Sequence, residues 1–348
     1  MSEEWDSVWA RYGEQLRCRS SEPVRPFEGL SGAQVWRFTS EARGICALRR
    51  WPQDHPTGKK LEEIFSALTM AAKRGCDFVT IPFSALDGRP YVRHENHLWQ
   101  IEPWKPGAPV AAPSDEQLRR AFACLAQFHF AVRDVETRRP TRSVSPAVTR
   151  RLDVLADCTA ARFDAIRAFA HERQSELQAA VAADLDDYLR IFRKLSPAVE
   201  QLLLLCSRRE VLLQTVIGDI HSEHVLFDGE RVSGIIDFGA LTTDSVALDL
   251  ARLVASYCGD DEARQQLALE AYEQAAAEYS RSAGLIAGGE LAIDERVLIE
   301  AFDKSGALLA PFRWLTWIFI ERRGFAHDGR VVARWRELMR RLRRMSET

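Results

Sequence analysis

Two acidic residues and one histidine are the residues of this chain best suited to chemistry. Asp219 and Asp237 each end an apolar segment, and His224 follows Asp219 by five positions. Carboxylates are costly to bury without a partner, so two of them at strand ends suggest a functional role. Brought together, two carboxylates can hold a divalent cation and accept a proton. This is the minimum equipment for phosphoryl transfer.

The segments around these residues predict a β-hairpin. The run Val211–Ile217 ends at Gly218, a residue that allows a sharp turn. Residues 227–231 (FDGER) have the composition of a hairpin turn, and Val232–Ile236 reads as the returning strand. Two acids 18 positions apart in sequence are therefore expected in one small volume. Asp249 begins or lines the following helix, where it could brace the loop through hydrogen bonds to backbone N–H groups.

Composition restricts the class of protein. A length of 348 residues suits two domains, with 46% hydrophobic and 28% charged residues as in soluble globular proteins. A net charge of −3 gives no case for a nucleic acid partner. The seven cysteines are scattered without a CxxC motif, which predicts neither disulfides nor a zinc ribbon and favours the cytoplasm. The N-terminus is no signal peptide, and no apolar run reaches the roughly 18 residues of a membrane span, so no membrane partner is expected.

The N-terminal part reads as a small sheet with one helix. Strands are predicted at 34–38 and 45–49, after the small-residue loop Gly29-Leu30-Ser31-Gly32. A helix is predicted over 58–74 from its period of 3.6 residues, with Gly75 ending it. Further strands are predicted at 78–85, 89–93 and 98–102, with Asp87-Gly88 as a hairpin turn.

The segment Pro103-Trp104-Lys105-Pro106-Gly107 is the best boundary between domains. Beyond it the chain is mostly helical, starting with a capping box at Ser114. The predicted helices cover about 115–134, 148–170, 173–206, 260–282, 294–323 and 329–345. The expected architecture is thus α+β, with a β-rich N-terminal lobe at 1–102 and a helical C-terminal lobe at 103–348.

Phosphoryl transfer from ATP needs several parts, and each has a candidate here. One carboxylate orients or deprotonates the acceptor hydroxyl, and a second carboxylate with another group holds Mg²⁺ against the phosphates. A cation and a glycine-containing loop steady the phosphates. The order of the candidates along the chain is consistent with this scheme.

The chain resembles the aminoglycoside phosphotransferase/choline kinase-like family of the protein kinase-like superfamily. That family carries an H-G-D-x-x-x-x-N loop, an I-D-[FW] metal element, a D-L-A helix start and an L-A-x-x-H helix end. The corresponding residues here are Ile217-Gly218-Asp219 with His224, Ile236-Asp237-Phe238-Gly239, Asp249-Leu250-Ala251 and Leu125-Ala126-Gln127-Phe128-His129. The resemblance covers about residues 26–255 and implies a two-lobed, protein kinase-like fold.

The resemblance also implies a role for each residue. Asp219 would be the catalytic base, and Asp237 would hold the metal ion with His224. Asp249 and His129 would give structural support. The nucleotide would be bound by the glycine loop, by the strand cation with its helix acid, and by backbone groups of the 101–104 hinge; the residues are Gly29, Ser31, Gly32, Arg49, Glu63 (or Glu62), Glu102 and Trp104. The implied cofactors are ATP and Mg²⁺, and the implied partner is a small hydroxyl-bearing acceptor, bound by a monomer or homodimer.

Three positions depart from the family pattern. Ile217 replaces the loop histidine, His224 replaces the metal-binding asparagine and Arg49 replaces the strand lysine. Mg²⁺ prefers oxygen ligands, so His224 favours Mn²⁺ or leaves the metal on Asp237 alone. Arg49 keeps the positive charge and can chelate phosphate oxygens.

Two alternatives follow from these departures. The first is a catalytically silent nucleotide-binding protein with the same fold. The second is a metal-dependent hydrolase that uses Asp219, His221, His224 and Asp237. The sequence does not identify the acceptor.

Overall fold

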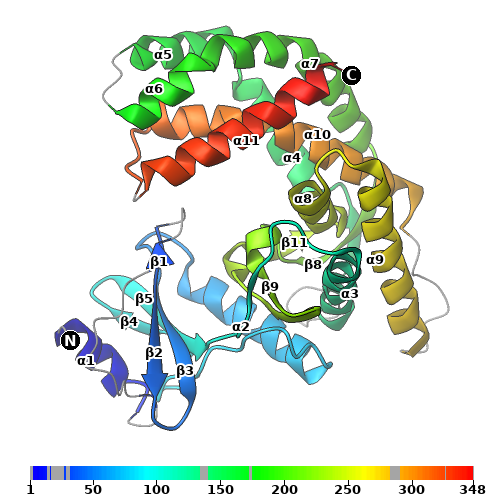
Figure 1. Ribbon diagram of the computed structural model, residues 1–348. Helices are drawn as coiled ribbons and strands as arrows, with labels where there is room; N and C mark the ends of the chain where they lie inside the picture. The colour runs from blue at the N-terminus through cyan, green and yellow to red at the C-terminus, as the bar shows by residue number, and fades with distance from the viewer. Residues whose placement is uncertain are drawn as a thin grey trace. The chain divides into compact units, whose positions relative to one another are not determined.

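The computed structural model describes residues 3–13, 16, 27–28, 32–133, 140–171, 175–282, 291–325 and 327–347. Gly29 and Ser31 of the predicted nucleotide loop lie outside these ranges. Two compact units are present (Figure 1). The first contains Met1–Pro140, Gln214–Thr243 and Gln266–Glu290, and the second contains Thr141–Leu213, Asp244–Gln265 and Leu291–Thr348.

A five-stranded antiparallel sheet forms the N-terminal part of the first unit. Its order is β1-β2-β3-β5-β4. The strands are β1 (Phe27–Glu28), β2 (Gln34–Ser40), β3 (Gly44–Arg50), β4 (Val92–His94) and β5 (His97–Pro103). Buried and exposed residues alternate along β2, as expected for a strand with one face on a core. The strands predicted at 34–38, 45–49 and 98–102 are therefore confirmed.

The predicted strand at 78–85 is wrong, and the hairpin turn is misplaced. Residues 78–85 are irregular, and Pro82 lacks the N–H that a strand ladder needs. Asp87-Gly88 does form a tight turn, closed by the Gly88 N–H on the Ala85 carbonyl at 2.9 Å, but no strands flank it. The β4–β5 hairpin turns instead at Glu95 and Asn96, whose φ angles of 45° and 61° suit a type I′ turn.

Two helices pack in this part of the chain. Helix α1 (Glu3–Ala10) places Val8 and Trp9 in a core with Trp36, Phe38 and Trp99 of the sheet. Helix α2 (Gly58–Lys73) confirms the helix predicted over 58–74. It is capped by Thr57, and it ends before Gly75, whose φ of 90° favours glycine.

The rest of the first unit carries the loops of interest. Helix α3 (Asp115–Ala131) has the predicted capping box at Ser114. Strands β9 (Val225–Asp228) and β10 (Arg231–Ile235) form the predicted hairpin, and β6 (Ala108–Pro109) pairs with β9. Because β6 and α3 contact this hairpin, residues beyond 103 belong to the first unit, and the two units do not coincide with the predicted lobes 1–102 and 103–348.

Short elements lie before and after the β9–β10 hairpin in the chain. Strand β8 (Val211–Val216) precedes the 3₁₀ turn Ser222–His224, and β10 precedes the 3₁₀ turn Phe238–Ala240 and β11 (Thr242–Asp244). In the second unit, β7 (Thr141–Ser143) pairs with the start of β8.

The second unit is mainly helical. Its helices are α4 (Pro146–Asp157), α5 (Ala160–Ala170), α6 (Glu176–Ala183), α7 (Leu185–Cys206), α8 (Ala247–Cys258), α10 (Ile293–Leu315) with a π-helical end (Thr316–Ile320) and α11 (Asp328–Glu347); α9 (Glu262–Ser282) starts here and continues in the first unit. The helices predicted over 148–170 and 173–206 are each divided in two, at Thr159 and at Asp184. Thr159 accepts a hydrogen bond from the Arg162 N–H, so a new helix begins there.

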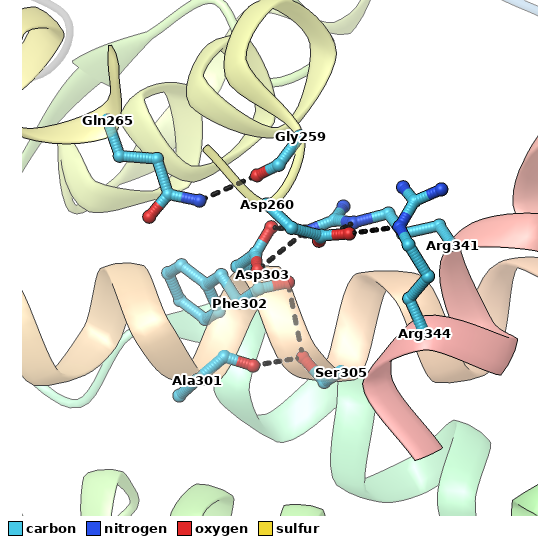
Figure 2. A network of polar contacts seen from close by, with 9 residues as sticks. All are labelled: Gly259, Asp260, Gln265, Ala301, Phe302, Asp303, Ser305, Arg341 and Arg344. Carbon is cyan, nitrogen blue, oxygen red and sulfur yellow. Dashed lines mark hydrogen bonds and ion pairs between the residues drawn. The ribbon is translucent and has the colours of Figure 1, made fainter. Parts of the chain in front are cut away.

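Ion pairs fix the C-terminal helix to its own unit (Figure 2). Arg341 contacts both carboxylate oxygens of Asp303 on α10, at 2.5 and 2.7 Å. Asp260, between α8 and α9, pairs with Arg341 at 3.4 Å and with Arg344 at 2.7 Å. Two of the basic residues of α11, Arg341 and Arg344, thus form ion pairs within their own unit. Across the described ranges, no helix combines the length and apolar character that a membrane span needs.

Candidate active site

Arg49, near the end of β3, links two carboxylates. Its Nη1 lies 3.5 Å from Asp237 Oδ1, and its Nη2 lies 3.5 Å from Glu102 Oε1. The guanidinium carbon also lies 4.7 Å from the centre of the Trp51 ring. Only 12% of the Arg49 side chain is exposed. A buried cation is therefore shared between an acid of the sheet and an acid of the loop after β10.

The pairing of Arg49 with Glu102 corrects the prediction that Glu63 or Glu62 of α2 would be its partner. In the β3–β5 register Arg49 faces Gln100 and Ala47 faces Glu102, so Glu102 is a diagonal neighbour on the same face. Diagonal neighbours lie within reach of long side chains, and the small Ala47 leaves room. Glu62 instead accepts a hydrogen bond from the Tyr91 hydroxyl at 3.2 Å.

Asp237 is held in an uncommon backbone conformation. Its φ of 64° is left-handed, which non-glycine residues rarely adopt outside functional sites and turns. Burial by itself would raise the pKa of its carboxyl group, but Arg49, His224, the Gly239 N–H and His221 together lower it. The Asp237 carboxylate is thus kept ionised and directed at cations.

His224 connects the Asp219 loop to Asp237. Its Nδ1 lies 3.0 Å from the backbone carbonyl oxygen of Asp219, and its Nε2 lies 3.7 Å from Asp237 Oδ2. Because a carbonyl only accepts, Nδ1 carries a proton, and Nε2 is the ring nitrogen that faces the Asp237 carboxylate. The His221 ring also packs on His224, with ring centres 3.7 Å apart.

Asp219 is exposed on the loop that follows β8. The preceding Gly218 has a φ of 85°, and a Cβ there would lie 2.5 Å from the Ala240 carbonyl oxygen. Only glycine fits this position, which brings the Asp219 loop against the loop of Asp237. Ile217 is fully buried, so the residue in place of the loop histidine is part of the core.

The predicted hinge is engaged in the sheet. The Trp104 N–H donates to the Ile45 carbonyl at 3.0 Å, and the Ile101 carbonyl accepts from the Phe83 N–H at 2.8 Å. These two groups are satisfied by the protein itself. The carboxylate of Glu102 pairs with Arg49. The sequence alone did not indicate this pairing, which depends on the register of β3 with β5.

The two predicted support residues are buried. His129 Nδ1 lies 2.9 Å from the Tyr272 hydroxyl, and the His129 carbonyl accepts from Gln214 Nε2 at 3.0 Å. Asp249 lies in the first turn of α8, in the second unit. Its bracing of the catalytic loop stays a prediction. Gly32, with a φ of 77°, is the part of the nucleotide loop that the structure describes.

A cavity of about 30 Å³ adjoins the ion cluster. Its polar walls come from Arg49, Gln100, Glu102 and Asp237, and apolar walls come from α2 and Phe238. Within the described ranges, no group of three or more His, Cys, Asp or Glu side chains is gathered as a metal site. The four residues of the hydrolase alternative therefore do not form such a site.

Comparison with known proteins identifies the family and the fold. A model of a phosphotransferase enzyme family matches residues 23–285. A spectinomycin phosphotransferase solved with ADP and spectinomycin is 12% identical, with a TM-score of 0.64 over 92% of each chain. An amicoumacin kinase solved with AMP-PNP and Ca²⁺ is 13% identical, with a TM-score of 0.57 over 96% of this chain and 95% of that one. An aminoglycoside phosphotransferase from Alicyclobacillus acidocaldarius is 16% identical, with a TM-score of 0.53 over 98% and 96%.

These structures are distant in sequence, so their likeness confirms the predicted α+β, protein kinase-like fold. No curated protein sequence is significantly similar to the chain. The family model spans well over half of the 348 residues, including β3, the Asp219 loop and Asp237. The chain therefore belongs to the phosphotransferase enzyme family and is, by that membership, a small-molecule kinase.

Proposed function

We propose that this protein transfers the γ-phosphoryl group of ATP to a hydroxyl group of a small metabolite. The observation that carries this proposal is the bridge from Arg49 to Asp237, with His224 linking Asp237 to the backbone of Asp219. The residues proposed as phosphate-binding cation, metal-binding acid and base all belong to the first unit, which supports the proposal. The spectinomycin phosphotransferase solved with ADP and the amicoumacin kinase solved with AMP-PNP support this assignment.

Asp237 and His224 fit a divalent cation completed by nucleotide oxygens. Mg²⁺ is commonly held by one or two carboxylates together with substrate phosphates, so a larger set of protein ligands is not required. A bound cation would neutralise charge developing on the transferred phosphoryl group. Because Nε2 of His224 lies beside the Asp237 carboxylate, these two residues would hold Mn²⁺ as well as Mg²⁺.

Arg49 and Asp219 have separate roles in the proposed reaction. Arg49 binds phosphate oxygens, for which a planar guanidinium is well suited. If Asp237 held a cation, Glu102 would remain as the counter-ion that holds Arg49 in place. Asp219, exposed at the loop, orients the acceptor hydroxyl and takes its proton.

A catalytically silent nucleotide-binding protein is the second candidate. Two departures from the family pattern favour it: Ile217 is fully buried in place of the loop histidine, and His224 stands in place of the metal-binding asparagine. Binding of ATP without turnover on any acceptor would be its signature.

A metabolite screen tests the proposal. The purified protein is incubated with ATP and a library of hydroxyl-bearing metabolites, once with Mg²⁺ and once with Mn²⁺, and ADP release is measured. Acceptor-dependent ADP release supports phosphotransfer. ATP binding in a thermal-shift assay with no ADP release across the library would favour the silent protein.

A further inference from the structure

A second and larger cavity lies in the first unit, apart from the ion cluster. Its volume is about 310 Å³. The walls come from the end of α2 (Ala72), residues 75–77 and 79–81, Pro103 and Lys105. Pockets for small molecules start at about 300 Å³, so this cavity suits a compact ligand. None of the proposed catalytic groups lines it.

The inner wall of this cavity is mostly apolar. Cys76 is fully buried, Val79 is 5% exposed, and Ala72, Ile81 and Pro103 add further aliphatic surface. Such a lining favours an apolar ligand body, because contact removes hydrocarbon from water on both sides. The sequence offers no motif for this cavity, since its residues come from two separate segments.

One end of the cavity carries positive charge. Lys105 Nζ donates to the backbone carbonyl of Asp77 at 2.5 Å, which places the ammonium group at the wall. The Asp77 carboxylate is already paired with Arg231 at 2.6 Å. Asp77 thus contacts two cations, Arg231 through its carboxylate and Lys105 through its backbone carbonyl. Burial lowers the pKa of the Lys105 ammonium group, Asp77 raises this pKa and Arg231 lowers it. A ligand carboxylate beside the ammonium group would stabilise its charged form.

Thr80 and Pro103 connect this cavity with the ion cluster. Thr80 lines both cavities, and its hydroxyl is buried with no hydrogen-bond partner in the part of the chain that the structure describes. Pro103 follows Glu102 directly on β5. A ligand that moves either residue would alter the wall that holds Arg49.

We propose that this cavity binds a small monoanionic molecule with an apolar body, of the medium-chain carboxylate class. The aliphatic part contacts Ala72, Cys76, Val79 and Pro103, and the carboxylate pairs with Lys105. Occupancy changes the affinity for nucleotide through Thr80 and Pro103. The binding itself is independent of phosphotransfer, whereas the effect on nucleotide rests on the proposed function.

Calorimetric titration with octanoate and 1-octanol tests the proposal. We expect octanoate to bind the wild-type protein in one copy, and octanol at least about tenfold more weakly, because it lacks the charge. Lys105→Gln should weaken octanoate about tenfold and leave octanol unchanged. The matched control is Lys59→Gln, an exposed lysine of α2 that does not line the cavity. Ala72→Phe should fill the cavity and abolish binding of both probes.

The outcomes separate cleanly. Equal binding of the two probes, or octanoate binding that Lys105→Gln leaves intact, would overturn the anion site. Melting temperatures of the variants show whether each is folded. If Ala72→Phe does not fold, Lys105→Gln still tests the anion site, because Lys105 is partly exposed and its replacement does not disturb the core. ATP affinity is then measured with and without saturating octanoate. A change below twofold overturns the coupling, while absence of ATP turnover in the metabolite screen bears only on phosphotransfer.

Discussion

Replacing Glu102 by glutamine should weaken nucleotide binding more than replacing Glu63 by glutamine. The structure pairs Arg49 with Glu102 on β5 and with Asp237, at 3.5 Å each. When Asp237 turns to a metal ion, Glu102 is the remaining counter-ion. Without it, Arg49 loses the group that positions it for phosphate.

The size of the effect follows from distance and burial. Two unit charges 3.5 Å apart interact by about 5 kcal/mol at an effective dielectric constant of about 20. Desolvation offsets much of this, and breaking a buried pair costs about 3–5 kcal/mol in all. Glu102 is 21% exposed and Arg49 keeps a second partner, so we expect about 2 kcal/mol, or about thirtyfold.

The assay is the dissociation constant of ATP with Mg²⁺, measured by calorimetry, together with KM and kcat once an acceptor is known. Glu102→Gln is expected to raise the dissociation constant and KM about thirtyfold, and Glu102→Asp to recover part of the loss. Glu63→Gln is the matched comparison, because the family pattern would assign the role to α2. A larger loss for Glu63→Gln than for Glu102→Gln would refute the reasoning.

Three further predictions concern stability and reactivity. Asp244 is fully buried and accepts hydrogen bonds from Ser145, Ala147, Arg150 and Ser245. Asp244→Ala should therefore lower the free energy of unfolding, measured by urea denaturation, by about 3–5 kcal/mol. The control Asp186→Ala, at an exposed aspartate, should change it by less than about 1 kcal/mol. Gly218→Ala should abolish turnover and reduce the melting temperature, because its Cβ would lie 2.5 Å from a backbone oxygen at a φ of 85°. Burial raises the pKa of the Cys76 and Cys124 thiols to about 12, so neither should react with iodoacetamide at pH 8 in the folded protein, as mass spectrometry can measure; rapid alkylation of the native protein would contradict this.

The strands and loops around Asp219 and Asp237 were predictable from local sequence. Alternating and apolar runs identify β2, β3, β5 and the β9–β10 hairpin, and Gly218 marks the sharp turn. These features depend on near neighbours in the chain. The family resemblance then supplies the order of these elements and the chemistry expected of the two acids, and the match to the family model agrees with the resemblance.

Long-range pairing was not predictable in the same way. The partner of Arg49 depends on the register of β3 with β5, which no local pattern determines. The family pattern points to an acid on α2, but with arginine in place of lysine the guanidinium contacts Glu102. The strand predicted at 78–85 failed for a similar reason, because its apolar residues serve packing of a loop and Pro82 prevents a ladder.

The central claim is that Asp219 is the base of an ATP-dependent phosphotransfer. The most direct measurement compares wild type with Asp219→Asn, in acceptor-dependent ADP release and in ATP binding. Asparagine keeps the size of the side chain but cannot accept the proton, so turnover should fall by about 10²–10⁴-fold. ATP affinity should stay within about threefold, because Arg49, Glu102 and Asp237 are unchanged. Turnover within tenfold of wild type in Asp219→Asn would contradict the assignment.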